Sequence, residues 1–219
     1  MNNNSNTIIL KEFKSLYETK KYEDALTILH ENKPMFDPGV YEFNIGLIYI
    51  KQEHYTLARI NLERAKEYGF MNNELNSALD EVKNFLDVTR LEENVSASDN
   101  INEILFDLPK EIFFSISVLL IIIFILYYKK IQSVAIRIAS LVIIIFPIVF
   151  YFTVVSGKSE VVLLEELPVR RGPSEMFEEV QVVPKGMKVF INDQIGGWNL
   201  IVHPKSHQGW IKTEKVEKI

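Results

Sequence analysis

Two tryptophans and a pair of arginines in the last third of the chain are the side chains best suited to binding chemistry. Trp198 and Trp210 each follow a glycine, and an exposed indole ring can stack on a peptide or a sugar. Arg170 and Arg171 precede a Gly-Pro pair, and guanidinium groups bind carboxylates through paired hydrogen bonds. These four residues form a candidate ligand-binding set. The alternative is structural: the tryptophans fill a small core, and the arginines pair with local acids such as Glu175.

Other chemistry finds little support in the sequence. His203 and His207 are four residues apart in a predicted hairpin loop, without further ligand residues nearby, so no metal site is predicted. The chain contains no cysteine, which excludes disulfides, thiolate nucleophiles and cysteine-based metal centres. It also lacks a nucleophile elbow, a P-loop, a His-Glu-x-x-His motif and a dinucleotide fingerprint. We therefore predict a protein that is not an enzyme, with no catalytic residues and no cofactor.

Short alternating segments position the two tryptophans. Five strands are predicted, at residues 161–164, 179–183, 188–191, 198–202 and 208–211. Short strands at this spacing indicate a small β-barrel. The turn signals between them, at 169–174, 185–189, 196–198 and 209–211, resemble those of bacterial SH3 (SH3b) domains along residues 158–219. Pro168 and Arg171 depart from the Asn and Ser common in the opening motif of that family, which affects the first loop and not the fold.

Two long apolar runs in the middle of the chain predict a transmembrane hairpin over residues 111–156. Residues 112–128 and 138–155 contain no charged side chain, and at about 1.5 Å per residue each spans most of a bilayer core. Transport and proton-relay roles usually need ionisable groups within the spans. Because neither run contains one, we interpret the hairpin as an anchor.

The basic residues of the connecting turn predict the orientation. Short loops rich in Lys and Arg stay in the cytoplasm, so Lys129, Lys130 and Arg137 place the turn there and both soluble domains outside. Ahead of Lys11, the apolar stretch 8–10 is too short for the core of a signal peptide. Three explanations stay open: the true start lies upstream, the N-terminal part is exported by an unusual route, or both termini are cytoplasmic.

Before the membrane segment the chain repeats itself. Residues 22–29 match residues 55–62 at an offset of thirty-three, and the second copy resembles a tetratricopeptide repeat (TPR). In that pattern the small residues Gly46 and Ala58 let two helices approach closely. We expect about five helices over residues 7–88, the last of them capping the stack with an apolar face.

The concave face of such a stack is its usual binding surface. Here the candidate protein-binding residues are Lys14, Tyr17, Phe43, Leu47, Ile50 and Lys51. The alternative is that the apolar members of this set pack against the capping helix, and that the surrounding charges form a solvated face.

The predicted fold is a multidomain chain of the α + membrane + β class. It comprises a TPR-like α-hairpin stack (7–88), a polar linker (89–110), a two-helix transmembrane hairpin (111–156) and a small SH3-like β-barrel (158–219). The net charge of −5 is mildly acidic, and no basic face for nucleic acid is suggested.

This order of parts resembles the BatE-like proteins of the Bat aerotolerance group, found beside MoxR-type ATPases and membrane proteins with von Willebrand A domains. The resemblance covers the architecture of the whole chain. It implies a non-catalytic scaffold in the bacterial inner membrane, with both soluble domains on the periplasmic side and the repeat domain contacting other envelope proteins. A second hypothesis is a cell-wall sensor whose SH3b domain binds peptidoglycan peptides. A third keeps both termini in the cytoplasm, where the barrel would recruit a soluble partner.

Overall fold

The computed structural model describes residues 3–89, 91, 104–105, 108, 110–130 and 132–219. Two compact units make up the chain: Met1–Val95 together with Ser159–Ile219, and Ser96–Lys158. The second unit is thus an insertion between the two halves of the first. The predicted linker at 89–110 lies mostly outside the described residues.

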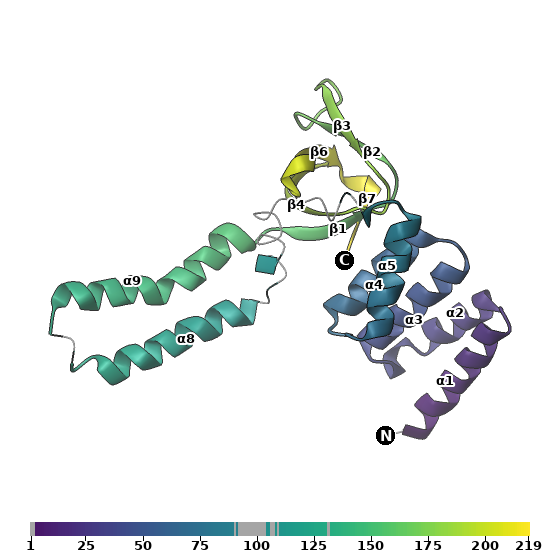
Figure 1. Cartoon of the computed structure of the whole chain (residues 1–219), viewed down its shortest axis with the longest axis horizontal. Helices are drawn as coiled ribbons and strands as arrows, with labels where there is room; N and C mark the ends of the chain where they lie inside the picture. The colour runs from purple at the N-terminus through teal and green to yellow at the C-terminus, as the bar shows by residue number, and fades with distance from the viewer. Residues whose placement is uncertain (1–2, 90, 92–103, 106–107, 109, 131) are drawn as a thin grey trace. The chain divides into compact units, whose positions relative to one another are not determined.

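Helices form the first half of the larger unit (Figure 1). They are α1 (Asn3–Glu18), α2 (Tyr22–Glu31), α3 (Pro38–Lys51), α4 (Tyr55–Glu67) and α5 (Asn73–Phe85), with a 3-10 turn at Lys33–Met35. The Asp37 side chain caps α3 by accepting from the backbone N–H groups of Gly39 and Val40, and Asn72 caps α5 in the same way. Gly46 lies so close to α4 that an added Cβ would be 2.7 Å from Leu62. Glycine at this position therefore allows α3 and α4 to pack tightly.

Seven antiparallel strands form the second half of the larger unit. They are β1 (Ser159–Leu163), β2 (Leu167–Arg170), β3 (Glu179–Val183), β4 (Lys188–Ile195), β5 (Trp198–His203), β6 (Gly209–Lys212) and β7 (Val216–Lys218). Short 3-10 turns lie at Lys205–His207 and Thr213–Lys215. The strand order is β3-β2-β6-β5-β4-β1-β7. Because β3 and β7 stand at the two ends of this order, the sheet is open, and the predicted closed barrel is not shown.

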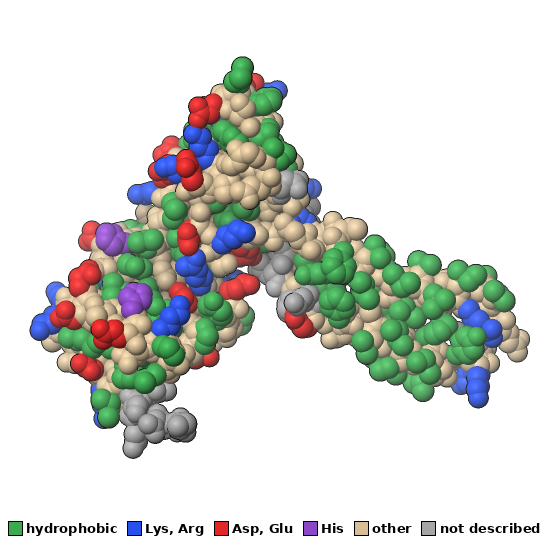
Figure 2. Space-filling model, turned by 180° about the vertical axis from the view of Figure 1, so that it is seen from behind, with side chains coloured by type: hydrophobic (Ala, Val, Ile, Leu, Met, Phe, Trp, Pro, Cys, Tyr) green, Lys and Arg blue, Asp and Glu red, His purple; other side chains and the backbone are tan. Residues whose placement is uncertain are grey.

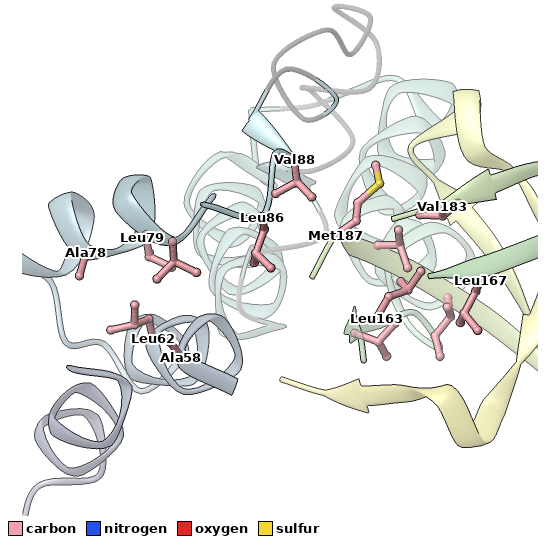
Figure 3. Packing of buried hydrophobic residues seen from close by; sticks show 14 of the residues in the cluster. Ala58, Leu62, Ala78, Leu79, Leu86, Val88, Leu163, Leu167, Val183 and Met187 are labelled. Atoms are coloured by element: carbon pink, nitrogen blue, oxygen red, sulfur yellow. The ribbon is translucent and has the colours of Figure 1, made fainter. Parts of the chain in front are cut away.

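A hydrophobic core joins α3, α4 and α5 to the sheet (Figure 3), and a second cluster packs α1 and α2 against α3. Buried residues of α4 and α5 belong to the same cluster as buried residues of β1, β2 and the turn before β4; among them are Leu62, Leu79, Val82, Leu86, Val88, Leu163, Leu167 and Met187. Gly186 approaches Leu86 so closely that an added Cβ would lie 2.5 Å from its side chain. Residues before and after the insertion therefore fold into one unit, whereas the sequence pattern predicted two separate domains.

The inserted unit contains two apolar helices, α8 (Lys110–Tyr127) and α9 (Val134–Phe150), and α9 continues into a π-helical turn at Tyr151–Val155. Phe113 near the start of α8 lies 5.5 Å from Tyr151 at the end of α9, ring centre to ring centre, so the helices run antiparallel. Of the described helices, one stretch of 22 residues, Val134–Val155, is long and apolar enough to cross a membrane; Glu111–Tyr127 is apolar but shorter. The prediction of two spans is thus met for one of them.

Candidate functional site

A pocket of about 630 Å³ opens on the sheet beside Trp198. One wall is the loop between β2 and β3, another is the turn between β4 and β5, and the third is the end of β6. Its lining residues are Pro173, Ser174, Glu175, Gly196, Gly197, Trp198, Lys212, Thr213 and Glu214. Three segments far apart in the sequence thus meet around one indole ring.

Glycines form the turn that leads into Trp198. Gly196 and Gly197 have φ values of +55° and +83°, a backbone conformation that suits a tight hairpin turn and disfavours other residues. The Gly197 carbonyl accepts a hydrogen bond of 2.9 Å from the backbone N–H of Thr213. This bond ties the turn to the segment that follows β6, so both walls are held in place.

Lys212 covers the Trp198 ring. These two residues are partners in the register of β5 and β6, and the Lys212 Nζ atom lies 6.0 Å from the indole ring centre. Only 8% of Trp198 is exposed. A ligand that stacks on this indole therefore has to move the lysine side chain aside.

Glu175 holds Lys212 from across the pocket. The Lys212 ammonium donates to the Glu175 carboxylate, and this hydrogen bond and the charge attraction raise the pKa of Lys212 and lower the pKa of Glu175. The Glu175 side chain is largely exposed and that of Lys212 is partly exposed, so the pair adds little to stability. Thr213 also lines the pocket, and its buried hydroxyl has no hydrogen-bond partner within the described part of the chain. A polar ligand that binds Lys212 or Glu175 could thus displace this ion pair at a small cost in free energy.

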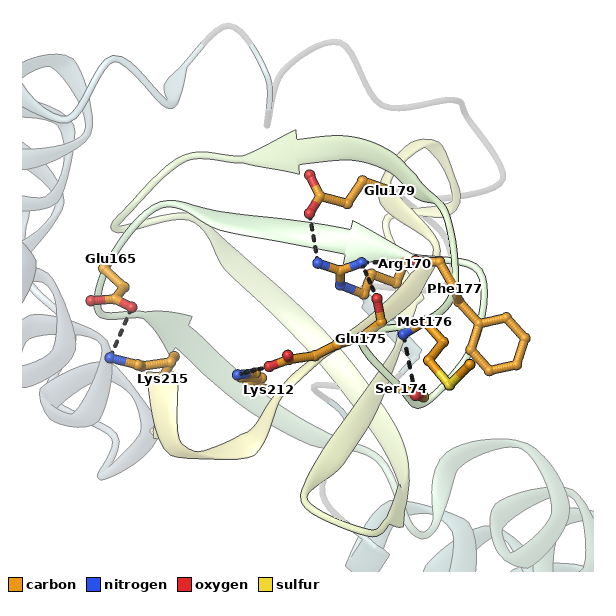
Figure 4. Close-up of polar contacts among 9 residues, drawn as sticks. All are labelled: Glu165, Arg170, Ser174, Glu175, Met176, Phe177, Glu179, Lys212 and Lys215. Carbon is orange, nitrogen blue, oxygen red and sulfur yellow. Dashed lines mark hydrogen bonds and ion pairs between the residues drawn. The ribbon is translucent and has the colours of Figure 1, made fainter.

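Arg170, predicted as a ligand-binding residue, instead organises the loop between β2 and β3 (Figure 4). Its Nη1 donates to the backbone carbonyls of Glu175 (2.9 Å) and Phe177 (2.7 Å). Its Nη2 pairs with the Glu179 carboxylate at 2.6 Å. Because its donors are engaged within the chain and its side chain is only 17% exposed, Arg170 positions one wall of the pocket and does not face a ligand.

The other two members of the predicted set lie outside the pocket. Arg171 pairs with Glu178 at 3.3 Å, and both side chains are well exposed. Trp210 is half-buried in β6, opposite Leu200 and Arg170 in the strand register. The arginines therefore follow the structural alternative, Trp210 lies outside the pocket, and Trp198, although mostly buried, is the one member of the set that lines it.

The apolar residues of the predicted binding face of the repeat domain are packed into the core. Phe43 and Ile50 are buried, at 6% and 7% exposure, and Leu47 packs against the same core. The Phe43 ring lies 4.8 Å from that of Phe70. These three residues cannot line an open groove, because α5 and the sheet cover that side of α3 and α4.

The polar members of that predicted face remain accessible. Lys14 is exposed and lies 3.8 Å from Glu18, and Lys51 is also exposed. Tyr17 is half-buried, with its ring 6.1 Å from Phe13 and 5.9 Å from Tyr22. They do not gather around a pocket with one another.

His203 and His207 lie in different environments. His203 is buried against Phe190, with ring centres 5.4 Å apart. The Nδ1 atom of His207 lies 2.9 Å from the Ser206 hydroxyl, and burial lowers the pKa of His207. His203 thus ends β5, whereas His207 lies in the 3-10 turn between β5 and β6.

Sequence reasoning missed Glu175, Lys212, Thr213 and Glu214. Lys212 and Glu175 are separated by 37 positions, so no local pattern connects them. The Gly-Gly-Trp turn was the one usable signal, since it marked the strand on which the pocket is built.

No family model, no curated protein and no solved structure matches this chain. The geometry described above is therefore the basis for the functional conclusions.

Proposed function

We propose that this chain is a non-catalytic, membrane-anchored scaffold of the bacterial envelope. The observation that supports it best is the shared core: residues on both sides of an apolar insertion fold into a single unit. Such an arrangement fits a protein that displays one rigid soluble module from a membrane anchor. In the proposal, the TPR-like helices contact other membrane or envelope proteins.

The anchor of this scaffold is a two-helix hairpin. Because Val88 belongs to the shared core before the insertion and Val161 after it, both connections start on the same side of the membrane. If Val134–Val155 crosses the bilayer, a second crossing is required, and α8 is the apolar helix available. Its 18 residues rise about 27 Å, slightly less than the ~30 Å core. Local thinning of the bilayer accommodates such a shortfall.

The basic turn supports the orientation of the scaffold. Lys130 and Arg137 lie against the rings of Tyr127 and Tyr128, at 5.3 Å and 4.6 Å from the ring centres. Tyrosine with Lys or Arg is typical of a membrane-water interface. A cytoplasmic turn would place the soluble module on the periplasmic side, where Bat-type partners such as von Willebrand A membrane proteins are the proposed contacts by resemblance.

The test compares the full chain with a variant in which a flexible Gly-Ser linker replaces residues 96–158, both tagged and expressed in cells. The scaffold proposal expects the full chain to resist extraction by alkaline carbonate and to cross-link to membrane proteins. The variant should be soluble and lose those cross-links. Extraction of the full chain by carbonate, or an unchanged cross-linked set with the variant, would contradict the proposal.

A second candidate function is binding of a cell-wall peptide, which the Trp198 pocket favours. Its indole, the Glu175 and Glu214 carboxylates, the Lys212 ammonium and the buried Thr213 hydroxyl could hold both charged ends of a short peptide. Retention of the detergent-solubilised chain on insoluble peptidoglycan tests this function.

Exposed pocket residues are better probes than the predicted arginines, because removing Arg170 would disturb the loop. We expect Lys212→Met with Glu175→Gln to abolish retention without loss of folding. The matched control is Lys215→Met with Glu165→Gln, which removes another ion pair of the same sheet, 3.0 Å long and outside the pocket. Equal retention by the two double variants would exclude the pocket as the peptide site.

A further inference from the structure

The β2–β3 hairpin carries four exposed apolar side chains close together in the sequence. Met176 is 95% exposed, and Phe177, Val180 and Val182 are each about half exposed. Figure 2 shows hydrophobic side chains at the far end of this hairpin, with acidic and basic side chains next to them. Neither the anchor nor the Trp198 pocket uses these four residues.

The hairpin loop presents these residues in a fixed conformation. Arg170 binds two loop carbonyls, the backbone N–H of Met176 donates to the Ser174 hydroxyl at 3.3 Å, and the Phe177 ring lies directly over Gly172. An interface formed by an ordered loop loses less conformational entropy on binding than one formed by a flexible loop. The loop is thus built for contact with a partner.

The β3 strand also has one edge without a neighbouring strand, since it stands at the end of the strand order. Pro168 lies opposite Val182 in the β2–β3 register, and proline has no N–H to donate. In an antiparallel pair, residues alternate between exchanging hydrogen bonds with the neighbour and facing away from it. We therefore expect the backbone groups of Val182 to face the open edge, whereas the β2–β3 register shifts at Val180, which has no direct partner on β2.

Charge along this edge changes sign from one end to the other. Glu178 and Glu179 lie at the start of β3, and Lys185 follows its end. An antiparallel copy of the same strand, centred on Gln181, would place Val180 opposite Val182 twice and each Glu178 opposite Pro184 of the second copy, one residue from Lys185. A parallel copy would bring like charges together.

We propose that the β3 edge and its loop form an interface with a second copy of this chain, joined by antiparallel β3–β3 pairing about a twofold axis at Gln181. The four exposed apolar residues of each copy are covered by the other. An anionic lipid surface fits this edge less well, because the carboxylates of Glu175, Glu178 and Glu179 border the apolar residues and would be repelled.

Cysteine cross-linking of the full chain in detergent micelles tests the twofold axis, since the chain has no native cysteine. Directly opposed residues in an antiparallel pair have Cα atoms about 4.5–5.5 Å apart, which suits a disulfide. Gln181→Cys should therefore form a disulfide-linked dimer under mild oxidation. The control is Glu166→Cys, an exposed position in the loop between β1 and β2, which should stay monomeric. Equal cross-linking at both positions, or none at Gln181, would overturn the proposal.

Charge reversal identifies the occupant of the edge. Glu178→Lys should abolish the Gln181→Cys dimer, and Glu178→Lys together with Lys185→Glu should restore it, because only a second copy carries both changes. The combined substitutions Val180→Lys and Val182→Lys should abolish the dimer. A dimer that survives the valine changes, or that is not restored by the double reversal, would contradict β3–β3 pairing and would indicate a different strand or surface as the partner.

Discussion

The Glu63 carboxylate of α4 lies 4.0 Å from the Lys188 ammonium at the start of β4. Both side chains are almost fully buried, at 5% and 9% exposure. Arg59, one turn earlier on α4, donates to the other Glu63 oxygen at 3.2 Å, and Glu160 of β1 lies 3.6 Å from Lys188. Two cations and two carboxylates therefore balance each other within the junction between helices and sheet. These charges make the contact between α4 and the sheet specific, because a different contact would leave one of the buried charges without its partner.

Replacing Glu63 should weaken the whole module. Glu63→Gln leaves Lys188 and Arg59 buried with one carboxylate fewer, and removing one partner from a buried ion pair costs about 3–5 kcal/mol. Denaturant unfolding in micelles, followed by the fluorescence of Trp198 and Trp210, measures the loss. Glu67→Gln, at an exposed position of the same helix, is the control and should change stability little. Equal effects from the two variants would show that the junction does not depend on this pair.

Acid should weaken the junction through the same carboxylate. Burial opposes the charged form of Glu63, but Lys188 and Arg59 outweigh it, so that the pKa of Glu63 is lowered. An unfolded glutamate titrates near about 4.3. The stabilisation is therefore present above that pH and is lost as the pH falls through the lower pKa of the folded state. Unfolding measured at several acid pH values should show a shallower decline for Glu63→Gln than for the native chain, and parallel declines would contradict this assignment.

Gly186 should tolerate no side chain. Its φ of +77° disfavours other residues, and an added Cβ would lie 2.5 Å from Leu86. Gly186→Ala should therefore combine backbone strain of about 1–2 kcal/mol with overpacking of about 1–3 kcal/mol. Gly69→Ala is the matched control, because Gly69 has φ of +83° and no atom within 4 Å of the added Cβ. If the two variants lose the same stability in denaturant unfolding, Leu86 does not press on the Gly186 turn.

Arg170 and Arg171 are adjacent but should differ in effect. Arg170→Met removes two hydrogen bonds to loop carbonyls and one ion pair, so amide hydrogen exchange should accelerate across residues 174–179. Arg171→Met removes one exposed ion pair and should leave exchange in this loop nearly unchanged. The same protection pattern in both variants would contradict the role assigned to Arg170.

Local sequence patterns predicted the helices and most strands, because each depends on periodicity within a short window. The apolar spacing of α5 and the Gly-Gly-Trp turn before β5 are examples. Two strands were missed: β2 contains Pro168 and was interpreted as turn punctuation, and β7 is short and carries two charged residues. β2 does alternate, with Leu167 and Val169 buried, but four residues around a proline give a weak strand signal.

Long-range packing could not be predicted in the same way. Leu86 and Gly186 lie on opposite sides of the apolar insertion in the sequence, and nothing in their neighbourhoods indicates contact. The same holds for Glu175 and Lys212 in the pocket. Phe43 and Ile50 have the spacing expected of a groove, but that spacing also suits a core, and the structure places them in the core.

The central claim is that the parts before and after the insertion share one core and therefore lie on the same side of the membrane. Single cysteines at Ser77, Ser133 and Ser206, all exposed positions, can be labelled in intact cells with a membrane-impermeant maleimide, with lysed cells as the control. Ser77→Cys and Ser206→Cys should behave alike, and Ser133→Cys should behave in the opposite way. Labelling of Ser77→Cys without Ser206→Cys, or the reverse, would place the two parts on different sides and contradict the shared core.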